Sequence, residues 1–583
     1  MAEENFIKDN DVPQLEEYDT GRTTPAAAVL PWDRFSRWIH CICVVTFDLE
    51  LGQALEIIYP GHINLSEQEK SNICYLAFPD SNSGCMGDTQ FHVRIRRSAG
   101  NAELMPEHQY YNQKCPVYLQ IDPGYYYGYV YFRQVKDKTL PRGYFQKSLV
   151  IVSRLSFLSL FTEVCSLIAP EYFENGEPSI EAACHDIDQW PSPVPGENVN
   201  LPLFGTVLQA YIPVQSKKPC SVVPSGSPPR MNSLVQPPPT VLRSIHEVNL
   251  FRCFSPVVSH VLLLWELVLT GEPIVVMASS PSTCSEMVQA LVSMIAPLTY
   301  CGDYRPYFTI HDSEFKEYTT KAHAPPYVIL GVTNPFFAKT LQHWPHIIRI
   351  CEPSNTETVQ KHKLKKGGNI KMLDSKPGVY THYRPFLHKD KLILKKLMKG
   401  IQTKRPGEVQ TALLKRHLLE VTQSFMIPLE RYMASLMPLQ KNISPFKAAP
   451  TPRPFNQEEF LATLGTSGPQ LTSIIKGDWV GLYRRFFRSP NFNGWYNMRH
   501  REVSQKLQAL QLQALSRADL KMWVKGRQEV EIVDMILRIR QKLEQCKAND
   551  LPLSDDVQEQ LRYRMSEIMC TLPEDLKAVL KVS

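Results

Sequence analysis

The stretch that decides the fold is LFRCFSPVVSHVLLLWELVLTGEPIVVMASSPS, residues 250–282. Residues 257–269 are apolar on nearly every side, which predicts a deeply buried helix. Pro256 suits the first helical position, and Gly271 is expected to end the helix. Residues 273–278 (PIVVMA) form a continuous apolar run, typical of a strand covered on both faces. A buried helix followed by a buried strand predicts a layered α/β fold.

Downstream of this stretch, helix and strand patterns continue to alternate. We expect a helix, two strands, a short helix and a strand at residues 282–295, 307–310, 327–330, 335–342 and 347–350. This alternation predicts a central α/β module with a mostly parallel sheet. From residue 385 strand signals nearly vanish, and an all-α C-terminal part is expected. Its clearest helical stripes are Ile532, Ile536, Ile539 and Leu543, and then Val557, Leu561 and Ile568.

Upstream, the patterns indicate an α+β module. The runs 41–47 (CICVVTF) and 54–59 (ALEIIY) flank a turn and predict a β-hairpin. Ser66 is placed to cap a short helix. Residues 90–96 alternate with period two, which predicts a strand with one face in solvent. A second hairpin is expected from the strands at residues 128–135 and 144–152. A helix at 155–168 and a further strand at 205–212 are expected to follow.

Two segments are expected to lie outside these modules. Residues 1–30 begin with seven acids and one lysine in the first 19 positions, which predicts a disordered acidic tail rather than a secretion signal. Residues 215–240 contain seven prolines, which predicts an extended linker over residues 217–241.

Composition narrows the class of protein. Of the 583 residues, 43% are hydrophobic and 21% are charged, which excludes a mainly disordered or fibrous chain. The 14 cysteines are too dilute for a disulfide scaffold, so a reducing, cytoplasmic compartment is expected. The apolar core of the 257–269 helix is shorter than the roughly 20 residues that a bilayer needs and contains His260 and Glu266, so no membrane-spanning segment is expected.

The net charge of +6 is unevenly placed. Residues 361–405 carry 14 Lys or Arg against two aspartates, a local charge of +12 (14 − 2). Within them, residues 391–399 (KLILKKLMK) predict an amphipathic helix whose polar side is formed by Lys391, Lys395, Lys396 and Lys399. The lysines are either a solvated face of a packed helix or an attraction to an anionic membrane. Nucleic-acid binding is disfavoured because no nucleic-acid fold signature accompanies them.

The sequence shows no catalytic motif. It contains no GxxxxGK[ST], HExxH, paired CxxC, DxDxDG or GxSxG, so no metal, cofactor or covalent chemistry is expected. Ser279, Ser280 and Pro281 follow a predicted parallel strand, where α/β folds place ligands, although simple capping of the next helix is the favoured interpretation. An interaction or regulatory protein is favoured over a small-molecule enzyme.

Five blocks of sequence support a family resemblance. They are PWDRFSRWIHCICVVTFDLELGQALEIIYP (31–60), FPDSNSG (78–84), FHVRIRR (91–97), the 250–282 stretch and YVILGVTN (327–334). Over about residues 31–500 the chain resembles DENN-domain proteins. The resemblance implies a longin-like module at 38–216, a central α/β module at 242–366 and a helical module at 367–500, with a helical extension at 501–583. It also implies guanine-nucleotide exchange on a Rab GTPase, at endosomal and particularly recycling membranes.

The resemblance also implies where the partner docks. In DENN modules the GTPase switch regions contact a surface shared by the longin-like and central modules, with no single catalytic side chain. The candidate contact residues at sheet ends are Asp48, Glu50, Leu51, Ser279, Ser280, Ser282, Thr333 and Asn334.

Two alternatives remain for the activity. Some relatives stimulate GTP hydrolysis with an arginine from the longin-like lobe, for which Arg94, Arg96 and Arg97 are available. Arg94 and Arg96 alternate on one strand face, which is the usual pattern of a solvated face. The other alternative is a scaffold that binds a Rab without acting on it.

Overall fold

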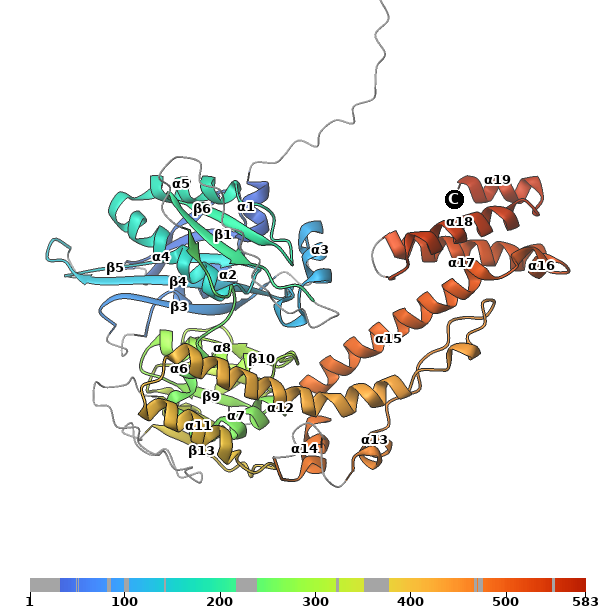
Figure 1. Ribbon diagram of the computed structural model, residues 1–583. Coiled ribbons are helices and arrows are strands. Elements are labelled where there is room, and N and C mark those ends of the chain that lie inside the picture. The colour runs from blue at the N-terminus through green and yellow to red at the C-terminus, as the bar shows by residue number, and fades with distance from the viewer. Residues whose placement is uncertain are drawn as a thin grey trace, which may run out of the picture.

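The computed structural model describes residues 32–48, 50, 52–80, 85–98, 104–140, 143–215, 239–320, 324–350, 377–465, 469, 475–547 and 551–582. The predicted acidic tail and residues 217–238 of the predicted linker lie outside these ranges. In Figure 1 the first sheet lies above a second sheet, and a long helix carries a final group of helices away from both.

The first sheet is antiparallel, with strand order β2-β1-β5-β4-β3. Its strands are β1 (Cys41–Asp48), β2 (Gly52–Tyr59), β3 (Gly87–Arg96), β4 (Tyr125–Lys136) and β5 (Tyr144–Ser153). Both predicted hairpins are confirmed, as β1–β2 and β4–β5. The helices of this part are α1 (Asp33–Trp38), α2 (Glu67–Leu76), α3 (Pro106–Lys114), η2 (Val117–Leu119), α4 (Leu158–Asn175) and α5 (Glu177–Asp188).

Helices cover both faces of this sheet. Alternate residues such as Ile42 and Val44 pack with α4, while Cys41 and Cys43 pack with α2 on the other face. Ser66 caps α2 in a reciprocal capping box with Glu69, as predicted. A small sheet of β6 (Asn198–Leu203), β7 (Thr206–Tyr211) and β8 (Thr240–Val241) follows, so the last two residues of the predicted linker form a strand.

The prediction that one face of β3 lies in solvent is wrong. Phe91–Ile95 are all buried, including His92 and Arg94. The reason is tertiary: α8 (Pro281–Ser293) of the second sheet region packs against β3, so the polar side of the alternation is covered as well.

The second sheet has the order β10-β11-β9-β12-β13, and its first four strands are parallel. The predicted mostly parallel α/β sheet is therefore confirmed. Its strands are β9 (Ile274–Met277), β10 (Asp303–Arg305), β11 (Val328–Val332), β12 (His346–Arg349) and β13 (Gly378–Thr381). Its helices are α6 (Leu250–Phe254), η3 (Ser255–His260), α7 (Val261–Leu269), α8 (Pro281–Ser293), α9 (Phe315–Thr319) and α10 (Phe337–Thr340).

One strand of this sheet was misplaced by the sequence pattern. The run 307–310 is not a strand, and β10 lies just before it, at Asp303–Arg305. Pro306 has no backbone N–H, so it cannot continue the hydrogen-bond ladder. Tyr307 and Phe308 are buried nonetheless, which is why their apolar pattern resembles a strand.

The helical run Leu250–Leu269 is long and apolar enough to cross a membrane by length and composition alone, but 72% of its apolar window is buried inside the fold. Burial of this kind is typical of a core helix. Residues 261–269 are buried on all sides, as predicted, and Gly271 ends the helix with φ +68°. The run kinks at Val257, so the predicted single helix is divided between η3 and α7.

The C-terminal part is helical, as predicted. It contains α11 (Lys391–Gln402), α12 (Gly407–Ser435), η4 (Gln440–Asn442), α13 (Gln457–Thr463), α14 (Trp479–Phe486), α15 (Pro490–Arg517), α16 (Leu520–Val524), α17 (Glu529–Lys547), α18 (Asp555–Met569) and α19 (Glu574–Val582). The two predicted apolar stripes are buried together in one cluster. Two features cross the expected module limits: β13 joins the second sheet, and α15 runs without a break through residue 500.

Candidate functional site

Two of the predicted loops meet at one edge of the second sheet. Strands β9 and β11 are parallel neighbours, with Met277 paired to Val332, and the N–H of Ala278 donates to the carbonyl of Val332 at 3.1 Å. Because both strands end here, the loops that follow them lie side by side. These loops carry the candidates Ser279, Ser280, Ser282, Thr333 and Asn334.

The serines of the first loop have unequal surroundings. Ser280 caps α8, since its hydroxyl oxygen accepts the N–H of Thr283 at 3.4 Å and its O–H donates to the Thr283 hydroxyl at 3.0 Å. Ser279 is exposed and Ser282 is half-buried. Ser280 therefore shapes the loop, and Ser279 is the most exposed of the three serines.

The second loop is joined to the first sheet. The hydroxyl of Thr333 donates to Asp80 Oδ2 at 2.7 Å, and the Asp80 N–H donates to the hydroxyl of Tyr307 at 2.8 Å. Tyr307 in turn donates to the carbonyl of Phe78 at 3.2 Å. Burial raises the pKa of Asp80, although hydrogen bonds from Thr333, Asn334 and Tyr307 partly oppose that rise. The chain that follows α2 is thus tied to the end of β11.

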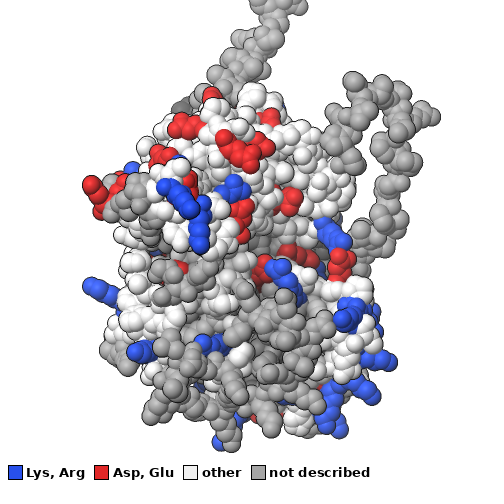
Figure 2. All heavy atoms as spheres, turned by 90° about the vertical axis from the view of Figure 1, so that its left-hand side faces the viewer, with Lys and Arg blue, Asp and Glu red and all other residues white. Residues whose placement is uncertain are grey.

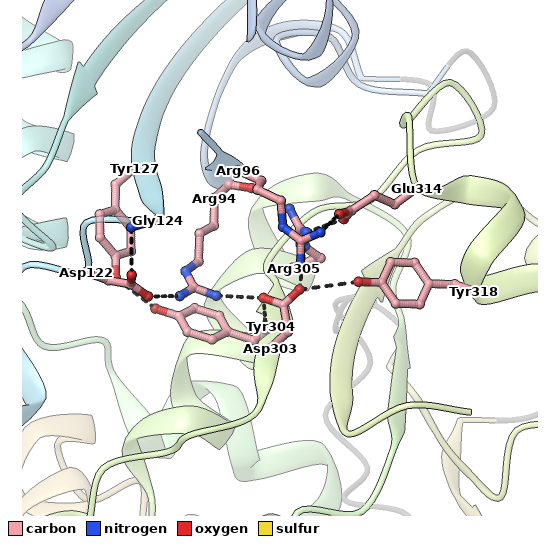
Figure 3. Close-up of polar contacts among 10 residues, drawn as sticks. All are labelled: Arg94, Arg96, Asp122, Gly124, Tyr127, Asp303, Tyr304, Arg305, Glu314 and Tyr318. Atoms are coloured by element: carbon pink, nitrogen blue, oxygen red, sulfur yellow. Dashed lines mark hydrogen bonds and ion pairs between the residues drawn. The ribbon is translucent and has the colours of Figure 1, made fainter. Parts of the chain in front are cut away.

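A charged network joins the same two sheets through β3 and β10 (Figure 3). Arg94 Nη1 lies 2.7 Å from Asp303 Oδ1, and its Nη2 lies 2.8 Å from Asp122 Oδ2. Arg305 Nε lies 3.1 Å from Asp303 Oδ2, and both Arg305 and Arg96 form ion pairs with Glu314. We define the seam as this interface, marked by Asp80 and Thr333 in one part and by Arg94 and Asp303 in another.

The network holds its aspartate ionised. Burial alone would raise the pKa of Asp303, but the ionic contacts with Arg305 and Arg94 outweigh burial and keep that pKa below its ordinary value. The Arg94 guanidinium also lies over the rings of Tyr125 and Tyr304, at 3.5 and 4.3 Å from their centroids. The first and second sheets are therefore fixed to each other by charge as well as by packing.

The three candidate arginines have different surroundings, and two of them, Arg94 and Arg96, belong to this network. Arg94 is only 6% exposed and is bound to carboxylates from both sides of the seam. Arg97 donates to the carbonyl of Pro123 at 2.7 Å. Arg96 remains 54% exposed while it pairs with Glu314. The expected solvated arginine face is wrong for Arg94, because the second sheet covers it.

Two of the remaining candidates, Asp48 and Glu50, lie away from the seam. Asp48 is the last residue of β1 and Glu50 lies in the turn that leads to β2, and Asp48 Oδ1 accepts the N–H of Glu50 at 2.7 Å. Strand β2 is the outermost strand of the first sheet, at the edge opposite β3. Leu51 lies outside the described residues. The structure therefore does not bring this turn to the edge formed by β9 and β11.

Sequence reasoning missed two residues at this edge. Asp80 ties the first sheet to Thr333, as described above. Phe336 is 49% exposed and stacks on Phe315 beside the Thr333–Asn334 loop. The sequence signal for Phe336 is the run NPFF directly after a buried strand, because an exposed aromatic ring in a loop is a common interface anchor. Among the described residues, no group of three or more His, Cys, Asp or Glu side chains is arranged to hold a metal ion.

Comparisons with known proteins agree with this architecture. Residues 144–348 match the DENN (AEX-3) domain, and residues 520–583 match the DENND6 C-terminal domain. The chain is 57% identical to Protein DENND6B of Mus musculus, over 95% of this chain and 94% of that protein. It is also 57% identical to mouse Protein DENND6A, over 97% and 93%, and 32% identical to the DENND6 homolog of Dictyostelium discoideum, over 87% and 77%. We expect the B form from chain length, but the identities to the two mouse forms are equal and do not separate B from A.

Proposed function

This chain belongs to the DENND6 family of DENN-domain proteins, and from that membership we propose that it is a guanine-nucleotide exchange factor for a Rab GTPase. In this proposal the first sheet with its helices is the longin-like module at 38–216, and the second sheet belongs to the central module at 242–366. The helical module at 367–500 and the extension at 501–583 complete the chain.

Exchange needs no reactive side chain. The factor binds the nucleotide-free GTPase more tightly than the loaded form, and by linkage it weakens nucleotide binding by the same factor. Picomolar nucleotide affinity corresponds to about 16 kcal/mol, and a rate gain of roughly 10⁴ needs about 5.5 kcal/mol of differential stabilisation. An interface with a few well-packed anchors is able to supply that amount.

The observation that carries the proposal is the shared edge at the seam. The loops after β9 and β11 are placed together by strand pairing, and Asp80 links them to the first sheet. Ser279 and Phe336 are exposed there. A partner that contacts both modules at once meets a preformed surface, so little ordering free energy is lost on docking.

The test is a GDP-release assay with the full chain and a panel of purified Rab GTPases. We expect release from one Rab, or a few related ones, to rise at least a hundredfold above its spontaneous rate. No acceleration with any member of a complete panel would contradict the proposal.

The same panel separates the alternatives. An activator of GTP hydrolysis would accelerate phosphate release through an arginine, and Arg96 is the exposed one of the three arginines in the Figure 3 network. Arg94 would first have to break its ion pairs with Asp122 and Asp303. A scaffold would bind a Rab and accelerate neither reaction.

For location, we propose that the protein is cytoplasmic and associates peripherally with recycling endosomes, as the family resemblance implies. Co-localisation of the tagged chain with internalised transferrin tests this. Exclusive association with another organelle would contradict it.

A further inference from the structure

Helix α11 is firmly anchored on one side. Its buried face includes Leu397 and Gly400, and the side-chain amide of Gln410 donates to the carbonyl of Leu397 at 3.1 Å. Asp390 caps the helix by accepting the N–H groups of Leu392 and Ile393 at 2.8 and 3.2 Å. The opposite face is therefore held in a fixed orientation toward solvent.

That opposite face has an unusual composition. At about 3.6 residues per turn, the four lysines fall within an arc of roughly 140° around the helix axis. Leu392 lies inside this arc and is 57% exposed. We call these side chains the lysine face; it consists of Lys391, Leu392, Lys395, Lys396 and Lys399.

The charges of the lysine face are not neutralised by the described parts of the fold. None of the four lysines forms an ion pair with another described residue, and all four are exposed. Nearby basic residues differ, because Lys415 pairs with Glu247 and Arg416 pairs with Glu420. Figure 2, which faces the left-hand side of Figure 1, shows acidic side chains mostly on the upper part of the molecule, whereas basic side chains are scattered over it and are densest at the lower right.

We propose that the lysine face of α11 docks on an anionic phospholipid surface, with Leu392 entering the headgroup layer. Ammonium groups are attracted by a charged surface without the fixed fork geometry that arginine brings to a specific carboxylate or phosphate partner. An exposed leucine among lysines matches the boundary between headgroups and acyl chains. Helix α11 contains no aromatic residue and no arginine, the side chains that stack on nucleic-acid bases. This proposal is independent of the exchange activity.

Vesicle sedimentation with the full chain tests the proposal. We expect binding to phosphatidylcholine vesicles that contain phosphatidylserine and little binding to phosphatidylcholine alone. The fourfold variant Lys391→Gln, Lys395→Gln, Lys396→Gln, Lys399→Gln should bind at least tenfold more weakly, because each basic residue near such a surface strengthens binding by roughly fivefold. Raising the salt from about 0.1 M to about 1 M should release the protein, since the screening length falls from about 10 Å to about 3 Å.

A matched control has the same net charge change elsewhere. The variant Lys136→Gln, Lys138→Gln, Lys506→Gln, Lys525→Gln removes four exposed lysines from other elements and should bind within twofold of the parent. The single variant Leu392→Ser should weaken binding severalfold while the thermal unfolding temperature stays the same.

Three results would overturn the proposal. Equal losses in both fourfold variants would mean that net charge alone controls binding. Equal binding to neutral and anionic vesicles would show that the lysines do not contribute to binding. Binding of the lysine face to a polyglutamate peptide or to RNA, without binding to the anionic vesicles, would assign it to another class of partner.

Discussion

Arg94 illustrates how one side chain joins two modules. It lies on β3 of the first sheet, pairs with Asp303 of the second sheet, and is covered by the ring of Tyr304. A buried cation is expensive to desolvate, so its role depends on keeping its partners. Its alternation with Arg96 suggested a solvated face, because sequence period reports which residues share a face but not what packs on it.

Removing the Arg94 side chain should destabilise the seam. Arg94→Ala leaves Asp122 and part of Asp303 without a counter-charge, and we expect the free energy of unfolding to fall by about 3 kcal/mol. Urea unfolding measures this change. The control Arg416→Ala breaks the exposed pair with Glu420 and should change stability by at most about 0.5 kcal/mol. Equal effects of the two variants would show that Arg94 does not hold the sheets together.

His92 should make the protein sensitive to acid. Burial lowers its pKa from 6.5 to about 3. Between these two pH values the unfolded chain binds a proton at His92 and the folded chain does not. The stability that this difference gives is fully present above pH 6.5 and is lost as the pH falls toward 3, by about 1.4 kcal/mol per pH unit.

The measurement is the slope of unfolding free energy against pH. His92→Gln should reduce that slope by about one proton between pH 6 and 4, whatever its effect on absolute stability. His40 and His246, whose pKa values burial lowers to about 4, contribute with the same sign and remain in the variant. An unchanged slope would show that His92 is protonated in the fold.

At the scale of elements, the edge formed by β9 and β11 is where the proposed exchange function places the docking surface. The sequence predicted β9 and α7 well because their apolar runs are continuous, and it predicted which loops follow the strands. It could not place Asp80 against Thr333, because that contact joins residues 253 positions apart. It also misplaced the strand before Tyr307, since burial without strand pairing leaves the same apolar pattern as a strand.

The exposed aromatic ring at this edge should matter for exchange. Phe336→Ala removes an anchor next to Asn334, and we expect the rate of GDP release at a fixed concentration to fall at least tenfold, or about 1.4 kcal/mol. Tyr327→Ala is the matched control, because Tyr327 is 53% exposed at the opposite end of β11. It should leave the rate within twofold. A larger loss for Tyr327→Ala than for Phe336→Ala would place the docking surface at the other end of the sheet.

On the scale of the whole molecule, α15 separates the two sheets from the last group of helices. It extends from the sheets to the α16–α19 unit, which has its own apolar cluster with Leu512 and Leu515 of α15 (Figure 1). The helical stripes predicted the cluster, but the separation of the unit from the sheets could not be predicted, since periodicity says nothing about the direction of a helix.

Deleting residues 520–583 should therefore affect α15 and spare exchange. We expect hydrogen-exchange protection to fall over residues 507–517, which lose their apolar partners, and to persist in α7 at the core of the second sheet region. The GDP-release rate should stay within twofold of the full chain. Loss of exchange would show that the C-terminal unit contributes to the docking surface.

In the proposed exchange mechanism the protein favours an emptied GTPase through surface complementarity alone. Titration of the full chain with Rab GTPases in nucleotide-free and GDP-loaded forms measures this preference. The nucleotide-free form of the partner Rab should bind at least a hundredfold more tightly, or about 2.7 kcal/mol. Equal affinity for the two forms would contradict it, because a factor that does not distinguish them cannot shift nucleotide binding.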